Sequence, residues 1–422
     1  MNTRLLINHL TNPPKYFSVS LLLILAVFHL RFGLLPAWQN INSDFPNYYT
    51  SSKLLIYGED LSNLYDDSWF QGKIKEYGIN ELGKFSPFPP STVFVMLPEA
   101  FFTPITAKRI YLVFNLFVLV FTSYLLKKIS GFSFLINLNF LLLSGIALVN
   151  NLLLGQFYLI LLMLIVLDYV ILIKKKEHLT GYFWGIGAAI KYFPLAFIPV
   201  LAFTKKWKTI SGMLAAVIIV NFISFFVVGS AAYKTFFDKV FFSHLNGELS
   251  SQSMFAVQFQ SWNSLLRHIF VYDPVENTNP LLNSTLVFDI ARAIVYLLFI
   301  SAAIYAVYKI KDDRELFPKS IAVSALLMFV LSPASASYHL LLLVFPAILL
   351  IVVSIRERKY EFTLIFILLY VLIGFVPLVL SKINIESLVF QYYRLWLNTV
   401  YFIAAVFYML YNNTITRRVA VT

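Results

Sequence analysis

One carboxylate, that of Asp44, lies at a position where it could act as an acid or base at a membrane surface. Asp44 follows a long apolar run over residues 16–38 and precedes the tyrosine pair Tyr48 and Tyr49. An acid at the mouth of a membrane helix, followed by an amphipathic stretch, can take a proton from a hydroxyl group at the water interface. Asp44 is therefore a candidate general base, and its alternative role is to cap the helix expected after it.

Other polar residues that are unusual for a membrane protein stand between the later apolar runs: Gln156, Lys191, Asn263, Arg267 and His339. Each also has a structural alternative, because a glutamine or histidine can bond to a helix end and an arginine can contact lipid headgroups. A carboxylate, cations and aromatic side chains on one side of a membrane suit a polar substrate with an anionic, lipid-borne partner. The sequence has no catalytic triad, HExxH, phosphate-binding loop or dinucleotide motif, and no metal site is predicted because the potential ligands are dispersed.

The composition is that of a helical membrane protein. Of 422 residues, 59% are hydrophobic and 13% are charged, whereas soluble proteins carry about 25% charged residues. The apolar runs are continuous and of helix length, which excludes a β-barrel. The net charge of +12 resides in clusters between apolar runs, a positive-inside pattern that does not indicate nucleic acid as a partner. Residues 1–422 are expected to form a single transmembrane domain in the inner (plasma) membrane.

The lysine and arginine clusters are expected to be cytoplasmic, so an even number of crossings separates each neighbouring pair. This rule predicts about 12 crossings with both termini cytoplasmic. Most of the crossings coincide with plain apolar runs: residues 133–151, 156–173, 209–229, 285–308, 320–332, 339–354, 362–380 and 392–411. The outer side then holds two large loops, residues 38–108 and 230–283, together with the polar residues named above.

Two intervals do not fit a plain crossing. The run from Phe88 to Thr103 is short and contains prolines, so it is expected to be an interfacial or re-entrant segment of the first outer loop, beside interfacial helices. The interval after Lys176 contains Lys191 and Pro194. A proline breaks a helix, and a lysine in mid-membrane costs about 2.5–3.5 kcal/mol. A broken pair of helices, about 179–190 and 193–204, is therefore expected to meet on the outer side. The alternative is one helix from which Lys191 snorkels.

Five stretches resemble motifs of one known family, in that family's order. The stretch DFPNYYTSSKLLIYGEDLSNLY resembles the first outer loop of glycosyltransferase family 87, polyprenyl-phosphate-sugar-dependent transferases of the GT-C superfamily. The other four are FSPFPPSTVFVMLPEAFF, LLLGQFYLILLML, GYFWGIGAAIKYFPLAFIPVL and LSPASASYHLLLLVFP. Phe88 replaces a tyrosine of the family pattern. In the last motif Ala336 stands in place of a tryptophan and Tyr338 in place of the first of two histidines, which leaves His339.

The resemblance implies a GT-C-type helical bundle that transfers a mannose-like or arabinofuranose-like sugar, with inversion, from a polyprenyl-phosphate donor. The acceptor would be a glycan or glycolipid on the periplasmic, extracytoplasmic face. On this hypothesis Asp44 is the general base, and Lys191 and Arg267 bind the donor phosphate. The residues expected to bind substrate are Tyr48, Tyr49, Gln156, Asn263 and His339. No cofactor is expected, with a divalent metal as an alternative that the sequence does not support.

A transporter or flippase of lipid-linked sugars is the alternative function, because such proteins also have many helices and broken spans. A flippase needs polar groups through the depth of the membrane, whereas here these groups gather on the predicted outer side. The sequence also lacks an inverted repeat. A purely structural scaffold would leave Asp44 and Lys191 without a role.

Overall fold

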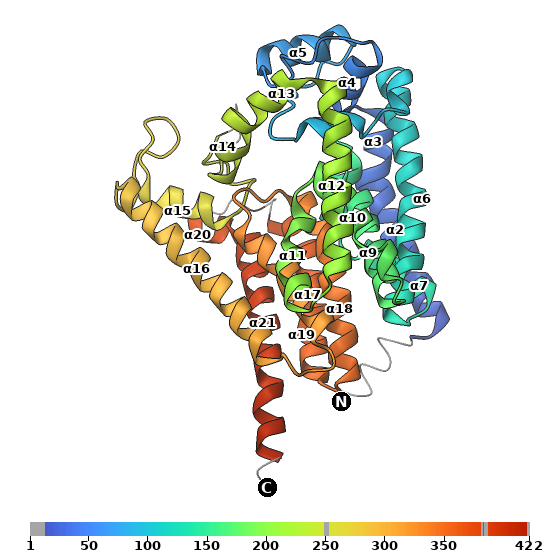
Figure 1. Cartoon of the computed structure of the whole chain (residues 1–422), viewed down its shortest axis with the longest axis vertical. Coiled ribbons are helices and arrows are strands. Elements are labelled where there is room, and N and C mark those ends of the chain that lie inside the picture. Colours follow the sequence, from blue (N-terminus) through green and yellow to red (C-terminus); the bar gives the residue numbers. More distant parts are fainter. Residues whose placement is uncertain (1–12, 249–252, 381–382, 384–386, 420–422) are drawn as a thin grey trace. The chain divides into compact units, whose positions relative to one another are not determined.

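The computed structural model describes residues 13–248, 253–380, 383 and 387–419. These residues form helices joined by loops and include no β-strand (Figure 1). Seven helices among them are long and apolar enough to cross a membrane. This confirms the predicted all-α integral membrane protein, whereas the number of about 12 crossings stays a prediction. The chain divides into two compact units, an N-terminal unit with α2 to α14 and a C-terminal unit with α15 to α21.

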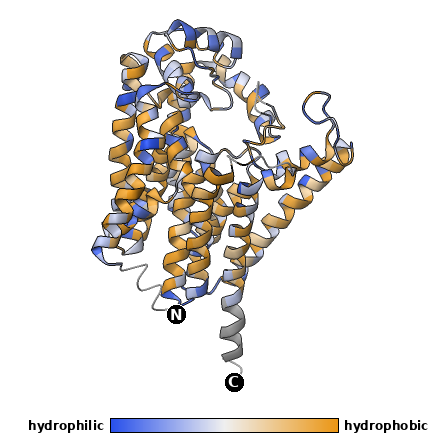
Figure 2. Ribbon diagram, turned by 180° about the vertical axis from the view of Figure 1, so that it is seen from behind, coloured by the Kyte–Doolittle hydropathy of each residue, from blue (hydrophilic) through white to orange (hydrophobic). Residues whose placement is uncertain are grey.

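Three spans frame the N-terminal unit. They are Lys15–Gln39, which joins α2 (Lys15–His29), η1 (Leu30–Leu34) and α3 (Leu35–Gln39), then α6 (Pro104–Ser130) and α12 (Trp207–Val228). Helix α6 begins at Pro104, because the first residues of a helix need no N–H for an intrahelical hydrogen bond. It ends before Gly131, whose φ of 74° is typical of a glycine that terminates a helix. Apolar residues cover the lengths of the helices, and polar residues concentrate toward the loops (Figure 2). The outer surfaces of these spans therefore suit contact with lipid.

The run 133–151, predicted as one crossing, is bent. Helices α7 (Phe134–Leu142) and α8 (Ile146–Leu154) meet at an angle of 75°. Gly145 between them has φ 57° and ψ −120°, a conformation that residues with a side chain avoid. The prediction of a continuous helix was wrong here, because one glycine in an apolar run does not reveal its backbone angles. Helix α9 (Tyr158–Ile173) follows after a short turn.

The predicted break at Lys191 is confirmed. Helix α10 (Tyr182–Ile190) ends there, Lys191 is extended with φ −144° and ψ 118°, and η5 (Phe193–Phe197) and α11 (Ile198–Phe203) follow. The proline at position 194 opens the new helical segment, where its missing N–H is tolerated. Neither half is long enough to cross a membrane by itself.

Helix α10 is held at both its start and its side. Asp168 of α9 accepts hydrogen bonds from the backbone N–H groups of Gly181 at 2.8 Å and Trp184 at 2.9 Å, which caps α10. Gly185 of α10 approaches α12 so closely that a Cβ atom there would lie 2.3 Å from the carbonyl oxygen of Met213. These contacts fix the position of Lys191 at the far end of α10.

The predicted first outer loop is largely helical, with α4 (Phe45–Ile56), α5 (Asp67–Glu76), η2 (Pro90–Phe94) and η3 (Glu99–Phe101). The segment from Phe88 to Thr103 contains only the two short 3₁₀ helices, so it does not form a spanning helix, as predicted. After α12 comes a second short-helix segment, which we call the arm: α13 (Ser230–Thr235), η6 (Phe236–Phe241) and α14 (Phe242–Leu245). Helices α4, α5 and α13 gather at one end of the N-terminal unit (Figure 1).

The C-terminal unit holds the remaining helices: α15 (Trp262–Phe270), α16 (Thr285–Lys309), α17 (Leu316–Leu331), η7 (Ser337–Leu343), α18 (Val344–Arg356), α19 (Tyr360–Leu380), α20 (Leu388–Gln391) and α21 (Tyr393–Val419). Four of its segments qualify as spans: α16, η7 with α18, α19 and α21. The span of η7 and α18 is the most enclosed of the four, with 83% of its most apolar 18 residues buried, whereas the corresponding share in α16 is only 11%.

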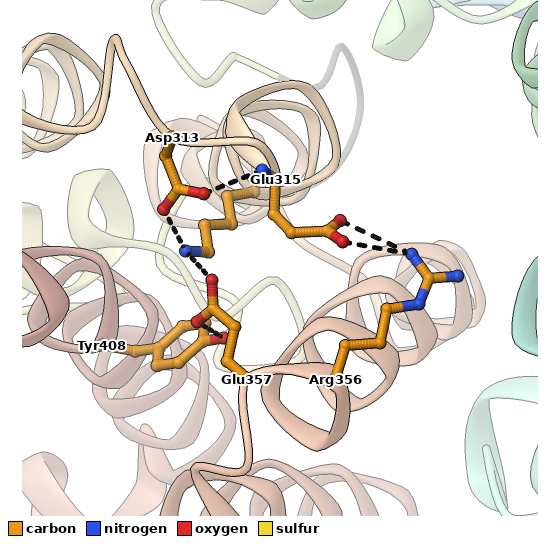
Figure 3. Close-up of polar contacts among 6 residues, drawn as sticks. Asp313, Glu315, Arg356, Glu357 and Tyr408 are labelled. Carbon is orange, nitrogen blue, oxygen red and sulfur yellow. Dashed lines mark hydrogen bonds and ion pairs between the residues drawn. The ribbon is translucent and has the colours of Figure 1, made fainter.

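A charge cluster around a buried lysine joins three helices of the C-terminal unit (Figure 3). The Lys319 ammonium of α17 is fully buried and lies 2.6 Å from Asp313 Oδ2 and 2.5 Å from Glu357 Oε1. The Tyr408 hydroxyl of α21 donates to Glu357 Oε2 at 2.6 Å. Every charge in this group has an opposite charge or a hydrogen-bond donor, so the cluster fixes α17 and α21 to the turn after α18.

Candidate active site

Asp44 occupies the N-cap position of α4 without capping it through its side chain. Its φ of 78° places it in a region that residues with a side chain rarely adopt. Such strain costs of the order of 1–3 kcal/mol and persists at functional sites when the surrounding structure enforces it. Capping of α4 therefore does not explain the position of the Asp44 carboxylate, which accepts a hydrogen bond from a residue outside this helix.

Gln156 holds the Asp44 carboxylate. Its Nε2 donates to Asp44 Oδ2 at 2.8 Å, and its Oε1 accepts a hydrogen bond from the Tyr48 hydroxyl at 2.8 Å. The Tyr111 hydroxyl also donates to the backbone oxygen of Gln156 at 3.0 Å. Gln156 is 1% exposed, so it is a buried link between Asp44 at the start of α4 and Tyr48 within that helix. These contacts favour a positioning role for Gln156 over the predicted contact with substrate.

The turn that carries Gln156 packs closely on α4. Gly155 has φ 66°, and a Cβ atom at this position would lie 3.0 Å from Lys108 Nζ and from the ring of Phe45. The buried Lys108 donates from Nζ to the carbonyl oxygen of Leu153 at 2.8 Å and lies 5.0 Å from the centre of the Phe45 ring. Its ammonium also attracts the Asp44 carboxylate. Lys108 was not predicted, because a lysine at the start of an apolar run looks like an ordinary helix end.

Lys191 points into a cage of aromatic rings. Its Nζ lies 3.9 Å from the centre of the Phe88 ring, 5.2 Å from that of Tyr158 and 5.5 Å from that of Tyr48. Asp44 attracts this ammonium as well. Within the described residues Lys191 Nζ has no hydrogen-bond or ion-pair partner. The snorkelling alternative fails, because the side chain turns inward toward the rings and not outward to a membrane surface.

Tyr49 differs from its neighbour Tyr48. The Tyr49 hydroxyl donates to the carbonyl oxygen of Phe102 at 2.7 Å, and its ring is fully buried. Lys53 Nζ lies 5.3 Å from the centre of that ring and donates to the same carbonyl at 3.3 Å. The hydroxyl therefore ties α4 to the end of η3, which favours a structural role over the predicted contact with substrate.

The other predicted residues belong to the C-terminal unit, where the structure does not gather them into one group. Asn263 Oδ1 accepts a hydrogen bond from Arg292 Nη1 at 3.2 Å, and the Arg267 guanidinium lies 4.8 Å from the centre of the Phe288 ring. His339 Nδ1 accepts from the backbone N–H of Ala336 at 3.3 Å, as in the helix-end alternative.

A further cation of the C-terminal unit was missed. Arg394 is 7% exposed and donates from Nη2 to the carbonyl oxygen of Gln258 at 2.6 Å. No sequence signal distinguished it from the interfacial arginines. For metal binding, the described residues hold no group of three or more His, Cys, Asp or Glu side chains placed around one ion. Metal independence stays a prediction.

The structure thus brings Asp44, Tyr48, Gln156 and Lys191 into one site of the N-terminal unit. Among known proteins, a search of curated proteins finds no match for this chain. The family model of glycosyltransferase family 87 matches residues 87–333, which is more than half of the 422 residues. The match includes the Gln156 turn and the break at Lys191 and starts after Asp44. The chain is therefore an integral membrane glycosyltransferase that belongs to glycosyltransferase family 87.

Proposed function

We propose that the protein transfers a sugar from a polyprenyl-phosphate donor to a hydroxyl group of a glycan or glycolipid, on the outer face of the membrane. The observation that carries the proposal is the strained Asp44, whose carboxylate Gln156 orients close to the caged ammonium of Lys191. A base and a cation in one partly buried site match the two charge changes of the transfer, which are the loss of a proton from the acceptor and the gain of negative charge on the departing phosphate. Family membership supports this reading over a flippase, which would transfer no sugar.

In the proposed reaction, the acceptor oxygen attacks the anomeric carbon of the donor sugar on the face opposite the phosphate. The bond between this carbon and the phosphate oxygen breaks as the new bond forms, so the configuration inverts. Asp44 accepts the proton of the acceptor hydroxyl as it attacks. The donor is a phosphate diester, and the departing polyprenyl phosphate carries one additional negative charge.

Lys191 suits the stabilisation of that additional charge. Within the described residues its ammonium is surrounded by rings and has no ion-pair partner, so an anion can approach it without displacing a carboxylate. A fixed cation in a poorly solvated site stabilises developing charge more than it would in water. The lipid chain would lie along the exposed apolar face of α12, where Phe222 is 63% and Phe226 is 70% exposed.

The experiment is donor binding and donor consumption by the purified full-length protein, with synthetic polyprenyl-phosphate sugars and a membrane extract as the source of acceptor. The wild type should bind and consume such a donor, and a lipid-linked sugar should copurify with it. Lys191→Met should bind the donor poorly while remaining folded. If the wild type moves a donor across vesicle membranes but never breaks its glycosidic bond, the flippase alternative is correct.

A further inference from the structure

The arm packs against both sides of the Lys191 cage. The ring of Phe236 lies 5.9 Å from that of Tyr65, measured between centroids, and the ring of Phe241 lies 5.8 Å from that of Tyr192. Tyr65 in turn donates its hydroxyl hydrogen to the carbonyl oxygen of Phe88 at 2.7 Å. Because Phe88 forms the near wall of the cage and Tyr192 follows Lys191 directly, the arm is fixed over this part of the N-terminal unit.

His244 stands at the end of the arm, close to two cations. Burial, followed by the positive charges of Lys191 and Lys84, lowers the pKa of His244 to about 4. The imidazole is therefore uncharged at neutral pH. Its Nδ1 atom is buried, and among the residues that the structure describes it has no hydrogen-bond partner. A buried polar atom without a partner is costly unless a bound group satisfies it.

Lys84 is held in this region by the helix that Asp44 begins. Its backbone N–H donates to Asn47 Oδ1 at 2.8 Å, and Lys84 is only 9% exposed. A Cβ atom on the preceding residue, Gly83, would lie 2.5 Å from the same Oδ1 atom, so a side chain there would have to displace the Asn47 amide. Burial lowers the pKa of the Lys84 ammonium, while the carboxylates of Asp67 and Asp44 act to raise it.

Three separate elements thus contribute basic side chains to one region. Lys84 of the first loop and Lys191 of the helix break both act on the His244 imidazole of the arm. Tyr192, which follows Lys191, contacts Phe241 of the arm. A neutral imidazole supplies one N–H donor, and the two ammonium groups supply positive charge. A group with several acceptor oxygens and a negative charge would complement both lysines and satisfy the imidazole. A phosphate diester has this chemistry.

We infer that Lys84, Lys191 and His244 together bind the phosphate of the lipid donor, with His244 supplied by the arm. This inference rests on the proposed function and adds Lys84 and His244 to it. The arm also has a surface suited to lipid, because Phe237, Phe242 and Leu245 are 50%, 62% and 53% exposed. A segment at the lipid boundary contacts the lipid chain through apolar residues and the headgroup through polar residues. The arm has both, an exposed apolar surface and a histidine near the cations.

The test compares two probes on the full-length protein in nanodiscs. One is a synthetic prenyl methyl phosphate, a diester whose single charge does not titrate, and the other is the uncharged prenol with the same chain. His244→Phe and Lys84→Met should each weaken binding of the phosphate probe about 10- to 100-fold, the range for a hydrogen bond to a charged group. Binding of the prenol should change less than about twofold, since the chain contacts remain. Lys75→Met, at an exposed lysine of α5, is the matched control and should affect neither probe.

His244→Asn separates a lost contact from a misfolded arm. Asparagine keeps a donor near the Nδ1 position and should recover part of the affinity that phenylalanine loses. Unchanged phosphate binding in His244→Phe and Lys84→Met, or equal weakening of both probes, would overturn the inference. If Lys191→Met alone loses the phosphate probe, the inference fails while the proposed function stands. If the wild type binds the diester no better than prenol, or inorganic phosphate displaces the diester at similar concentration, the lipid-phosphate donor itself is wrong.

Discussion

Tyr48→Phe removes one hydroxyl group from the contacts that hold the Asp44 carboxylate. That hydroxyl donates to Gln156 Oε1, and Gln156 Nε2 donates to Asp44 Oδ2, each at 2.8 Å. Without the hydroxyl, Gln156 loses the contact that determines which end of its amide faces Asp44. The aromatic ring remains, stacked on Phe88 with 4.9 Å between centroids, so the change acts on the hydrogen bond and not on the packing.

The magnitude follows from the buried acceptor that the variant leaves behind. An unsatisfied buried acceptor costs about 1–3 kcal/mol. If this cost appears as lost orientation of the base, the transfer rate falls about 5- to 150-fold, because about 1.36 kcal/mol corresponds to a factor of ten. Tyr111→Phe is the matched control, since the Tyr111 hydroxyl is also buried but donates to the backbone oxygen of Gln156. That variant should lose similar stability and little of the rate.

The assay is single-turnover consumption of a synthetic polyprenyl-phosphate sugar, combined with thermal unfolding of both variants in detergent. Tyr48→Phe should show a slower chemical step at saturating donor, with donor affinity close to that of the wild type. A wild-type rate in Tyr48→Phe would refute the positioning argument. Equal rate losses in Tyr48→Phe and Tyr111→Phe would show that general stability, and not the orientation of Asp44, explains the effect.

Three further predictions concern stability and topology. Lys319→Met should lower the free energy of unfolding by about 1–3 kcal/mol, because it leaves two carboxylates that are 21% and 20% exposed without their cation, and a shift in thermal unfolding measures it. The pKa of His244 is about 4 in the folded protein, below the ordinary 6.5, so the unfolded chain binds more protons between these values. The wild type should therefore lose up to about 3 kcal/mol of stability as the pH falls from 6.5 to 4, and His244→Asn should lack this loss. In this chain without cysteine, single cysteines should react with an impermeant reagent from outside at position 75, an exposed residue of the first loop, and not at the exposed position 174; outside labelling at 174 would contradict the charge-based topology.

Local signals were enough to predict the break at Lys191. A charged residue and a proline three positions apart oppose a continuous membrane helix, and α10 and η5 do separate there. The short helices of the first loop were also predictable, because the sequence after Asp44 is amphipathic and too polar to cross; their position at the membrane interface stays a prediction. Backbone angles were not predictable in the same way. The bend at Gly145 and the positive φ of Asp44 depend on tertiary contacts that no local pattern shows.

The candidate site itself depends on contacts between distant parts of the chain. Gln156 and Asp44 are 112 positions apart, and the family resemblance placed both in the site without showing that one orients the other. His244 was not singled out, because a histidine in a loop of mixed composition carries no signal until the arm folds back over the Lys191 cage. Tyr48 and Tyr49 looked equivalent, yet helical geometry turns one toward Gln156 and the other toward Phe102.

The most direct measurement of the central claim is the single-turnover transfer rate of Asp44→Asn, with donor binding measured separately. Asparagine is nearly isosteric and keeps hydrogen bonding to its neighbours, but it cannot accept a proton from the acceptor hydroxyl. Loss of a general base should slow transfer about 10²- to 10⁴-fold while donor affinity stays close to that of the wild type, because cations hold the phosphate. Near-normal transfer in this variant would remove Asp44 from the chemistry, and normal chemistry with lost donor binding would reassign it to donor recognition.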